Sequence, residues 1–280
     1  MTPRFSRIST YPVVVRLVIF VGLLVIVWAP LGLSLYDTLD SRWASILPLL
    51  LLYVEFLALA QWWGRAVYGE PHMLRRYGLV WAGSSSRYLL LGLVIGSMGL
   101  LSMFTVQSLV GWVTWQLKGD WPRLAVEGLL VASGIGFAEE VLFRGWLLDE
   151  LERDYAPSAS LYASSIIFAL LHFIKPLDVV LKTLPQFLGL VLLGMALVWA
   201  KRAARGTLGL AIGLHAGLVG GYYLVNVGSL VAYSDGVPQW VTGIDRNPLA
   251  GAVGLVYLGV IALWMRQWAI TAGQVVRGNE

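Results

Sequence analysis

Eight long apolar segments limit what this chain can fold into more than any other feature of its sequence. They lie at about residues 12–35, 44–64, 88–115, 124–153, 158–174, 183–200, 207–227 and 249–268. Most of them approach the roughly 20 residues that a helix needs to cross a hydrocarbon core of about 30 Å. Strands of alternating polarity, which a membrane barrel would need, are not seen. We therefore predict an all-α membrane protein, a polytopic bundle of about eight transmembrane helices.

The composition agrees with this prediction and excludes other classes of protein. Hydrophobic residues make up 58% of the chain and charged residues 13%, whereas a soluble globular domain is about 25% charged. The net charge of +4 comes from scattered basic residues without interleaved aromatic ones, so we expect no nucleic acid partner. The chain has no cysteine, which excludes disulfides, thiol nucleophiles and thiolate metal sites. We expect membrane lipid around the protein, and the sequence does not indicate an oligomeric state.

The chain reads as one integral membrane domain over residues 1–280, without internal repeats. The apolar run from Val13 is longer than the core of a typical signal peptide, and no small-residue cleavage site follows before Tyr36. With a cytoplasmic N-terminus, the inside segments carry twelve basic residues and the outside loops six. By the positive-inside rule, we predict that both termini are cytoplasmic.

The stretch "GFAEEVLFRG" places charges inside an apolar segment, where an ionisable side chain is costly and needs a partner. Glu140 and Arg144 are four residues apart, in the order that favours an ion pair on a helix. Glu139 is rotated by about 100° from Glu140 and cannot share Arg144 in the same way. We expect Glu140 to be neutralised and Glu139 to be available.

His172 belongs to the next apolar segment, in "FALLH", where it shares a helix face with Phe168. The polar turn between the two segments centres near Ala156. Glu140 and His172 are each sixteen residues from Ala156, so both lie roughly 20 Å from the turn at 1.5 Å per residue. An antiparallel hairpin is expected to bring them together.

His215 lies in "GLAIGLHAGLVGGYY", beside glycines at four-residue intervals, Gly213, Gly217 and Gly221. Such a stripe of small residues lets a neighbouring helix approach closely. His215 is about 160° around the helix from the stripe, so we expect it to face a different neighbour and to meet the cluster of Glu139 and His172.

Polar groups inside a membrane often only join helices by hydrogen bonds. For Glu55 and Glu127 we favour that structural role, because neither begins a recognisable spacing. Glu139, Glu140, Arg144, His172 and His215 come from three segments, a convergence that packing alone explains poorly.

On these residues the sequence resembles the CAAX prenyl protease and bacteriocin-processing family, which includes the type II CAAX prenyl endopeptidases. The family's first motif, E-E-x-x-x-R, is matched by Glu139, Glu140 and Arg144. Its second motif, F-x-x-x-H, is matched by Phe168 and His172. The resemblance covers a protease-like motif core at about residues 124–230.

The third motif, H-x-x-x-N, is matched in part. His215 supplies the histidine, but Val219 stands where the family has asparagine. Asn226 lies on the same helix face as His215, roughly 16 Å further along an unbroken helix. Asn247 would have to fold in from a loop. The sequence therefore assigns no residue to this part of the family's site.

The resemblance implies an intramembrane endopeptidase that hydrolyses a peptide bond of a membrane-associated or lipidated peptide or protein. It implies that Glu139 activates a water molecule with help from His172, and that His215 stabilises the oxyanion. Glu140 and Arg144 would support Glu139. The residues that bind substrate are unknown from the sequence.

Zinc is an alternative cofactor, because family members have also been described as metalloproteases. Glu139, His172 and His215 would then be three ligands with an open fourth position. No H-E-x-x-H motif is present, and the resemblance makes no cofactor certain.

Two further functions remain open. Carboxylates and histidines in a membrane also form the proton relays of coupled transporters, although we find no paired inverted repeats. A catalytically silent membrane scaffold of the same fold is compatible with the loss of the asparagine at Val219.

Overall fold

The computed structural model describes residues 5–80, 83–116 and 120–273, and most of these residues are helical. Their contacts divide the chain into two compact units, which we describe separately. The first unit contains Met1–Tyr77 and Asp149–Tyr155, and the second contains Gly78–Leu148 and Ala156–Glu280.

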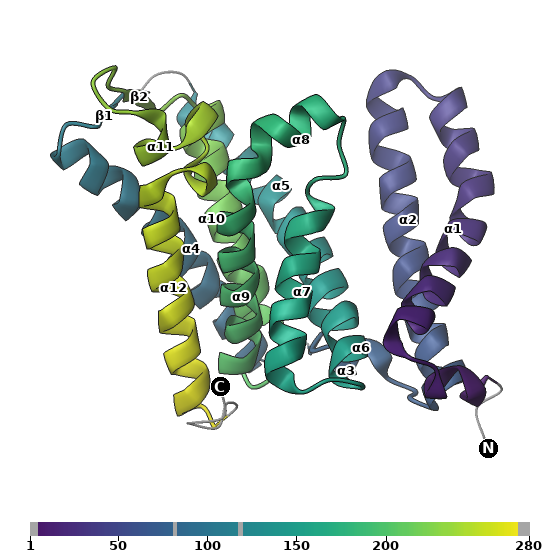
Figure 1. The fold of residues 1–280 in the computed structure, drawn as a ribbon. Coiled ribbons are helices and arrows are strands. Elements are labelled where there is room, and N and C mark those ends of the chain that lie inside the picture. The colour runs from purple at the N-terminus through teal and green to yellow at the C-terminus, as the bar shows by residue number, and fades with distance from the viewer. Residues whose placement is uncertain (1–4, 81–82, 117–119, 274–280) are drawn as a thin grey trace. The chain divides into compact units, whose positions relative to one another are not determined.

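The first unit is built on an antiparallel helical hairpin of α1 and α2 (Figure 1). Phe20 of α1 is buried and packs its ring edge-on against Phe56 and Trp63 of α2. The α2 helix continues into a π-helical turn, η2, before the chain reaches a short helix, α3. The elements are η1 (Ser6–Thr10), α1 (Val13–Thr38), α2 (Ser41–Trp63), η2 (Gly64–Tyr68), α3 (Met73–Arg76) and the end of α6 (Leu148–Glu152).

A buried ionic network joins the start of α1 to the end of α6 within the first unit. Arg16 donates to Glu150 at 2.9 Å and to Asp154 at 2.9 Å. The hydroxyl of Tyr68 donates to Glu150 at 2.7 Å. The side chains of Arg16 and Glu150 are 2% and 1% exposed. Since neither charge can exchange its partner for water, each depends on the other.

The second unit is a helical bundle centred on α10, which packs against α4, α5 and α9. The α9 helix in turn lies between α7 and α12 (Figure 1). Two short antiparallel strands, β1 and β2, pair Val113 with Tyr233. The elements are α4 (Gly83–Leu109), β1 (Val113–Trp115), α5 (Trp121–Glu140), η3 (Val141–Leu147), α7 (Pro157–Leu171), α8 (Leu177–Thr183), η4 (Leu184–Gln186), α9 (Phe187–Ala203), α10 (Gly209–Val227), β2 (Val231–Tyr233), α11 (Gln239–Thr242), η5 (Ile244–Arg246), η6 (Pro248–Ala250) and α12 (Ala252–Thr271).

The glycine stripe of α10 fits against glycines of α4. A Cβ atom at Gly217 would lie 2.5 Å from the carbonyl oxygen of Leu93, and one at Gly96 would lie 2.5 Å from that of Leu214. Backbones this close leave no room for a side chain at these positions, as expected for small residues at a membrane helix interface. The predicted close neighbour of the stripe is therefore confirmed, and it is α4.

The predicted class, an all-α multi-pass membrane protein, is confirmed. Among the described residues, six helical spans are long and apolar enough to cross a membrane. The predicted segments 124–153 and 158–174 are helical but fall outside these six, and α7 has only 15 residues. The count of eight, the single domain over 1–280 and the cytoplasmic termini stay predictions, and residues 1–4 and 274–280 lie outside the described residues.

The Arg16 network predicts an asymmetric response to loss of a cation. Arg16→Met leaves Glu150 buried without its cation, so we expect the free energy of unfolding in mixed micelles to fall by about 3–5 kcal/mol. Arg76→Met is the matched control, because Arg76 pairs with Asp149 while 46% exposed; we expect it to cost less than about 1 kcal/mol. Equal losses in the two variants would contradict this assignment.

Candidate active site

The two glutamates of the first motif lie at the end of α5, where the helix changes from α to π geometry. The π-helix η3 begins at Val141 and contains Arg144. Short π-helical turns are rare and frequently occur at functional sites. Glu140 is fully buried and accepts a hydrogen bond from Nη1 of Arg144 at 2.9 Å. The predicted pair of Glu140 and Arg144 is thus present in the structure.

Arg144 is fully buried, and both terminal nitrogens of its guanidinium donate hydrogen bonds. Its Nη2 donates to the carbonyl oxygen of Gly194 in α9 at 3.2 Å. The guanidinium carbon lies 4.4 Å from the ring centroid of Phe168 in α7 and 5.8 Å from that of Phe143. Such cation–π contacts stabilise a desolvated cation by about 2 kcal/mol. One arginine therefore connects η3 to α7 and α9.

His215 connects the same cluster to α10. Its Nδ1 lies 2.8 Å from Oε1 of Glu140, the same oxygen that Arg144 contacts. Its Nε2 lies 3.8 Å from Oε2 of Glu139. An ionised carboxylate can only accept, so Nδ1 carries the hydrogen and Nε2 of a neutral ring is an acceptor. His215 thus faces both glutamates, on the side away from the glycine stripe, as its position on the helix predicted.

Glu139 differs from Glu140 in its surroundings. Its side chain is 30% exposed, whereas that of Glu140 is 0% exposed. Oε2 of Glu139 and Oε2 of Glu140 are both buried atoms without a hydrogen-bond partner in the described part of the chain, and Nε2 of His215 lies 3.8 Å from Oε2 of Glu139. Glu139 is thus the more exposed carboxylate of the pair.

His172 lies at the C-terminal end of α7. Its Nδ1 is 2.8 Å from the carbonyl oxygen of Phe168, and its ring packs on the Phe168 ring at 4.6 Å. The Phe168 ring is also 6.3 Å from that of His215. Among the described residues, no hydrogen bond or ion pair joins His172 to Glu139. The two histidines are linked through Phe168.

The turn between the two motif helices lies where the sequence predicted it. Ala156 precedes α7, which begins at Pro157. The chain between Glu140 and this turn is not one regular helix, however, because η3 inserts π geometry before α6. Sequence spacing did not predict this change of helix type.

Lys201 is a site residue that the sequence analysis missed. Its Nζ donates to the carbonyl oxygen of Arg144 at 2.6 Å. In "WAKRA" it is one of two adjacent basic residues at the end of an apolar segment, and such residues are typical of topology-setting loops. The structure instead shows a cation that contacts the backbone of the π-helix.

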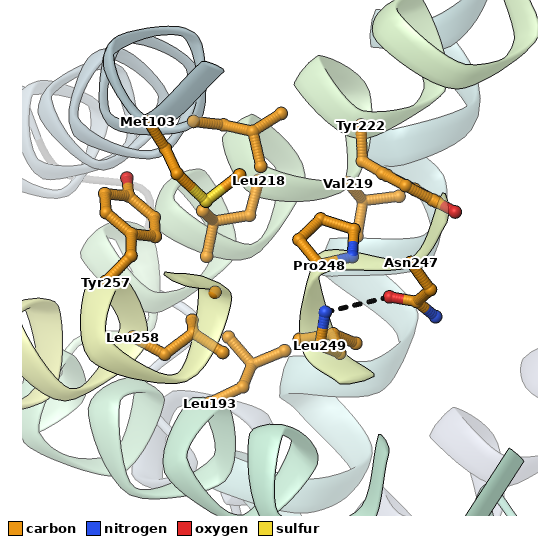
Figure 2. Close-up of a pocket in the computed structure, with 12 residues that line it drawn as sticks. Met103, Leu193, Leu218, Val219, Tyr222, Asn247, Pro248, Leu249, Tyr257 and Leu258 are labelled. Carbon is orange, nitrogen blue, oxygen red and sulfur yellow. Dashed lines mark hydrogen bonds between the residues drawn. The ribbon is translucent and has the colours of Figure 1, made fainter. Parts of the chain in front are cut away.

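The region around Val219 is apolar. Val219 lines a cavity together with Leu218, Leu193 and Leu249, and Asn247 lies at the same cavity (Figure 2). Asn226 does not line it; this residue lines a smaller pocket with Tyr222 and Arg246. Of the two asparagines considered from the sequence, Asn247 is therefore the one that shares a cavity with Val219.

A zinc site of the predicted kind would need three protein ligands around one position. Among the described residues, no group of three or more histidines and carboxylates lies close enough to hold a metal. Both histidines are engaged at Nδ1, His172 by the carbonyl oxygen of Phe168 and His215 by Glu140, which leaves only Nε2 of each ring for a metal. As placed, Glu139, His172 and His215 do not form the three-ligand set that zinc would need, and we derive no step through a metal.

Buried carboxylate, guanidinium and imidazole groups thus meet between the helices of a multi-pass membrane protein. Residues 121–220 match the family model described as "Type II CAAX prenyl endopeptidase Rce1-like". The match confirms over these residues the resemblance drawn from the motifs, and it supports a CAAX-type protease in general terms. No curated protein and no solved structure was found to match the chain.

The contact of Lys201 leads to a test of stability. In Lys201→Met the carbonyl of Arg144 loses a charged donor, and we expect the free energy of unfolding in mixed micelles to fall by about 1.5–3 kcal/mol. Arg202→Met is the neighbouring control, because Arg202 donates to the carbonyl oxygen of Pro157 at an exposed position. We expect its free energy of unfolding to fall by less than about 1 kcal/mol. Lys201→Arg should be more stable than Lys201→Met. If Lys201→Met loses no more stability than Arg202→Met, and Lys201→Arg is no more stable than Lys201→Met, Lys201 does not support the site.

Proposed function

We propose that this protein is an intramembrane endopeptidase that hydrolyses a peptide bond of a membrane-associated or lipidated substrate, with Glu139 as the base. One observation carries the proposal: adjacent glutamates in a membrane segment have opposite surroundings. Glu140 is fully buried and is held through Oε1 by Arg144 and His215, while the side chain of Glu139 is 30% exposed and makes no hydrogen bond to a cation in the described part of the chain. A structural role would be served by the paired glutamate alone.

In the proposed reaction, Glu139 takes a proton from a water molecule. The water oxygen forms a bond to the carbonyl carbon of the substrate, and the carbonyl oxygen becomes an oxyanion. Glu139 then gives the proton to the amide nitrogen as the carbon–nitrogen bond breaks. Such acid–base catalysis contributes about 10²–10⁴-fold to the rate.

His172 is suited to help Glu139 hold the water molecule. Because a carbonyl oxygen only accepts hydrogen bonds, Nδ1 of His172 carries the hydrogen toward Phe168. In the neutral ring, Nε2 is then a free acceptor. The half-buried position of His172 keeps this nitrogen within reach of water.

His215 would stabilise the oxyanion through Nε2. Since Nδ1 already donates to Glu140, Nε2 donates only when the ring carries both hydrogens. The charges of Glu139 and Glu140 are then balanced by those of Arg144 and His215. A cluster that is neutral overall costs less inside a membrane than one with an unpaired charge.

The expected surroundings of the site follow from the predicted topology. With both termini cytoplasmic, the end of α6 and the start of α7, which flank the turn at Ala156, would face the cytoplasm. The substrate would be a membrane-associated peptide or protein whose cleaved bond reaches the depth of Glu139. A catalytically silent scaffold remains the second candidate, because Val219 replaces the family's asparagine.

The first test replaces the proposed base. Glu139→Gln should lower kcat about 10²–10⁴-fold on fluorogenic peptides with Cys-aliphatic-aliphatic-X ends, farnesylated or not, in proteoliposomes. Glu127→Gln is the control on the same helix, since Glu127 pairs with Tyr223 at the exposed surface; its rate should stay within about twofold of the unmodified protein. Cleavage by Glu139→Gln at the rate of the control would refute Glu139 as base, and no cleavage by any form would favour the scaffold.

A second test separates the glutamate mechanism from a zinc mechanism. We expect cleavage to continue after dialysis against EDTA and 1,10-phenanthroline, because the proposed steps use only protein groups and water. The measurement is the initial rate before and after chelation, together with the zinc content by mass spectrometry. Loss of activity that returns with added Zn²⁺ would replace the glutamate mechanism by metal-assisted hydrolysis.

A further inference from the structure

The helix that carries the two glutamates continues beyond the candidate active site. The α5 helix passes into η3 and then into α6 without a residue between them, so residues 121–152 form one helical run. Its middle part, η3, has π geometry over seven residues. Since π-helices make up well under about 1% of residues in proteins, contacts outside the run are expected to hold η3 in this geometry.

The start of η3 is held by the groups of the site. Glu140 directly precedes η3 and is in contact with Arg144 and His215. Inside η3, the carbonyl oxygen of Arg144 accepts from Nζ of Lys201, and the guanidinium of Arg144 donates to the carbonyl oxygen of Gly194. These contacts fix one end of the π-helical segment.

The helix that follows η3 is held at its own end by Arg16. Nε of Arg16 donates to the carboxylate of Glu150 at 2.9 Å, and Nη1 donates to Asp154 at 2.9 Å. Nη2 donates to the backbone carbonyl oxygen of Glu150 at 3.0 Å, one of the last four carbonyls of α6, which have no partner within a helix. The backbone N–H of Val13 also donates to Asp154, at 2.7 Å. The end of α6 is therefore fixed through both its backbone and its side chains.

The contacts of Arg16 depend on the helix type of η3. A π turn closes its hydrogen bonds one residue later than an α turn, and one residue corresponds to about 100° of rotation in an α-helix. If η3 changed to α geometry while Glu140 kept its place, Glu150 would turn by about 100° around the helix axis. Because side chains lie about 5–6 Å from that axis, the carboxylate of Glu150 would move by about 8 Å. Its contact of 2.9 Å with Arg16 would then be lost.

We propose that Arg16 is a positioning residue for the proposed reaction: by holding the end of α6, it keeps η3 in the π geometry that directs Arg144 toward Glu140. Glu139, the proposed base, directly precedes Glu140 and depends on the same end of α5. Arg16 acts through the helix, since its contacts described above are with the end of α6. The inference rests on the proposed endopeptidase function, but the helix type of η3 can be tested without cleavage.

The first experiment measures cleavage by Arg16→Lys, which keeps a cation beside Glu150 and so avoids an unpaired buried charge. Lysine presents one ammonium group in place of the planar guanidinium fork, so we expect it to lose part of the contacts with Glu150 and Asp154. On the fluorogenic peptides in proteoliposomes, kcat should fall roughly 10–100-fold, the range for a small misplacement of catalytic groups. KM should stay within about twofold, because no group that binds substrate is changed.

The matched control is Arg76→Met. Arg76 pairs with Asp149 of the same helix, α6, while 46% exposed, and its loss leaves the contacts of Arg16 in place. We expect kcat and KM of this variant to stay within about twofold of the unmodified protein. Asp154→Asn is a milder second variant, since Asp154 is 26% exposed, and it should lower kcat less than Arg16→Lys.

The second experiment is hydrogen exchange measured by mass spectrometry in the same proteoliposomes, and it requires no cleavage. In Arg16→Lys, the amide groups of residues 141–147 should exchange at least about tenfold faster than in the unmodified protein, because η3 opens once the end of α6 is released. The amides of α9 and α10 should exchange at their unmodified rates. A role of Arg16 confined to the stability of the first unit would instead accelerate exchange in α1 and α2 and leave residues 141–147 unchanged.

The outcomes separate this inference from the proposed function. Faster exchange of residues 141–147 together with a lowered kcat would support Arg16 as a positioning residue. Unchanged exchange of these residues in Arg16→Lys would overturn it, and so would faster exchange with an unchanged kcat. Full cleavage by Glu139→Gln would refute the proposed function instead, and the two failures are distinguishable because the exchange measurement does not depend on Glu139.

Discussion

Oxygen Oε1 of Glu140 accepts from Arg144 at 2.9 Å and is 2.8 Å from Nδ1 of His215, and the arrangement of the second unit around the site depends on this shared contact. Arg144 carries the connection on to Gly194 of α9 and to the ring of Phe168 in α7. One buried carboxylate oxygen thus relates α5, α7, α9 and α10. Removal of any one partner would leave a charge in an environment without water, which is far more costly than loss of a surface pair.

The close approach of α4 to α10 supports this cluster from the opposite face. Because Gly217 meets the backbone of α4 directly, α10 has little freedom to rotate. His215, two residues earlier and on another face, is therefore held toward Glu139 and Glu140. If α10 could rotate, the imidazole of His215 could move away from Glu139, whose Oε2 lies 3.8 Å from Nε2. The close glycine interface with α4 restricts that rotation.

Local spacing accounts for what could be predicted. The pair of Glu140 and Arg144, the close neighbour of the glycine stripe and the turn near Ala156 depend on residues a few positions apart. The contact of Lys201 with Arg144 and the shared cavity of Val219 and Asn247 depend on tertiary folding, which periodicity does not encode. The count of membrane helices stays a prediction for another reason: α7 has 15 residues, too short to span by length alone although it is apolar.

The surroundings of Val219 explain why valine is compatible with the position where the family motif has asparagine. Along α10, His215 faces two carboxylates, and one turn later Val219 faces an apolar cavity. Polarity therefore changes over about 6 Å along one helix. An amide at position 219 would extend the polar region into the cavity wall, where it would need its own partner. With valine there, α10 contributes no amide to the cavity wall, and the amide at this cavity is that of Asn247 in the loop.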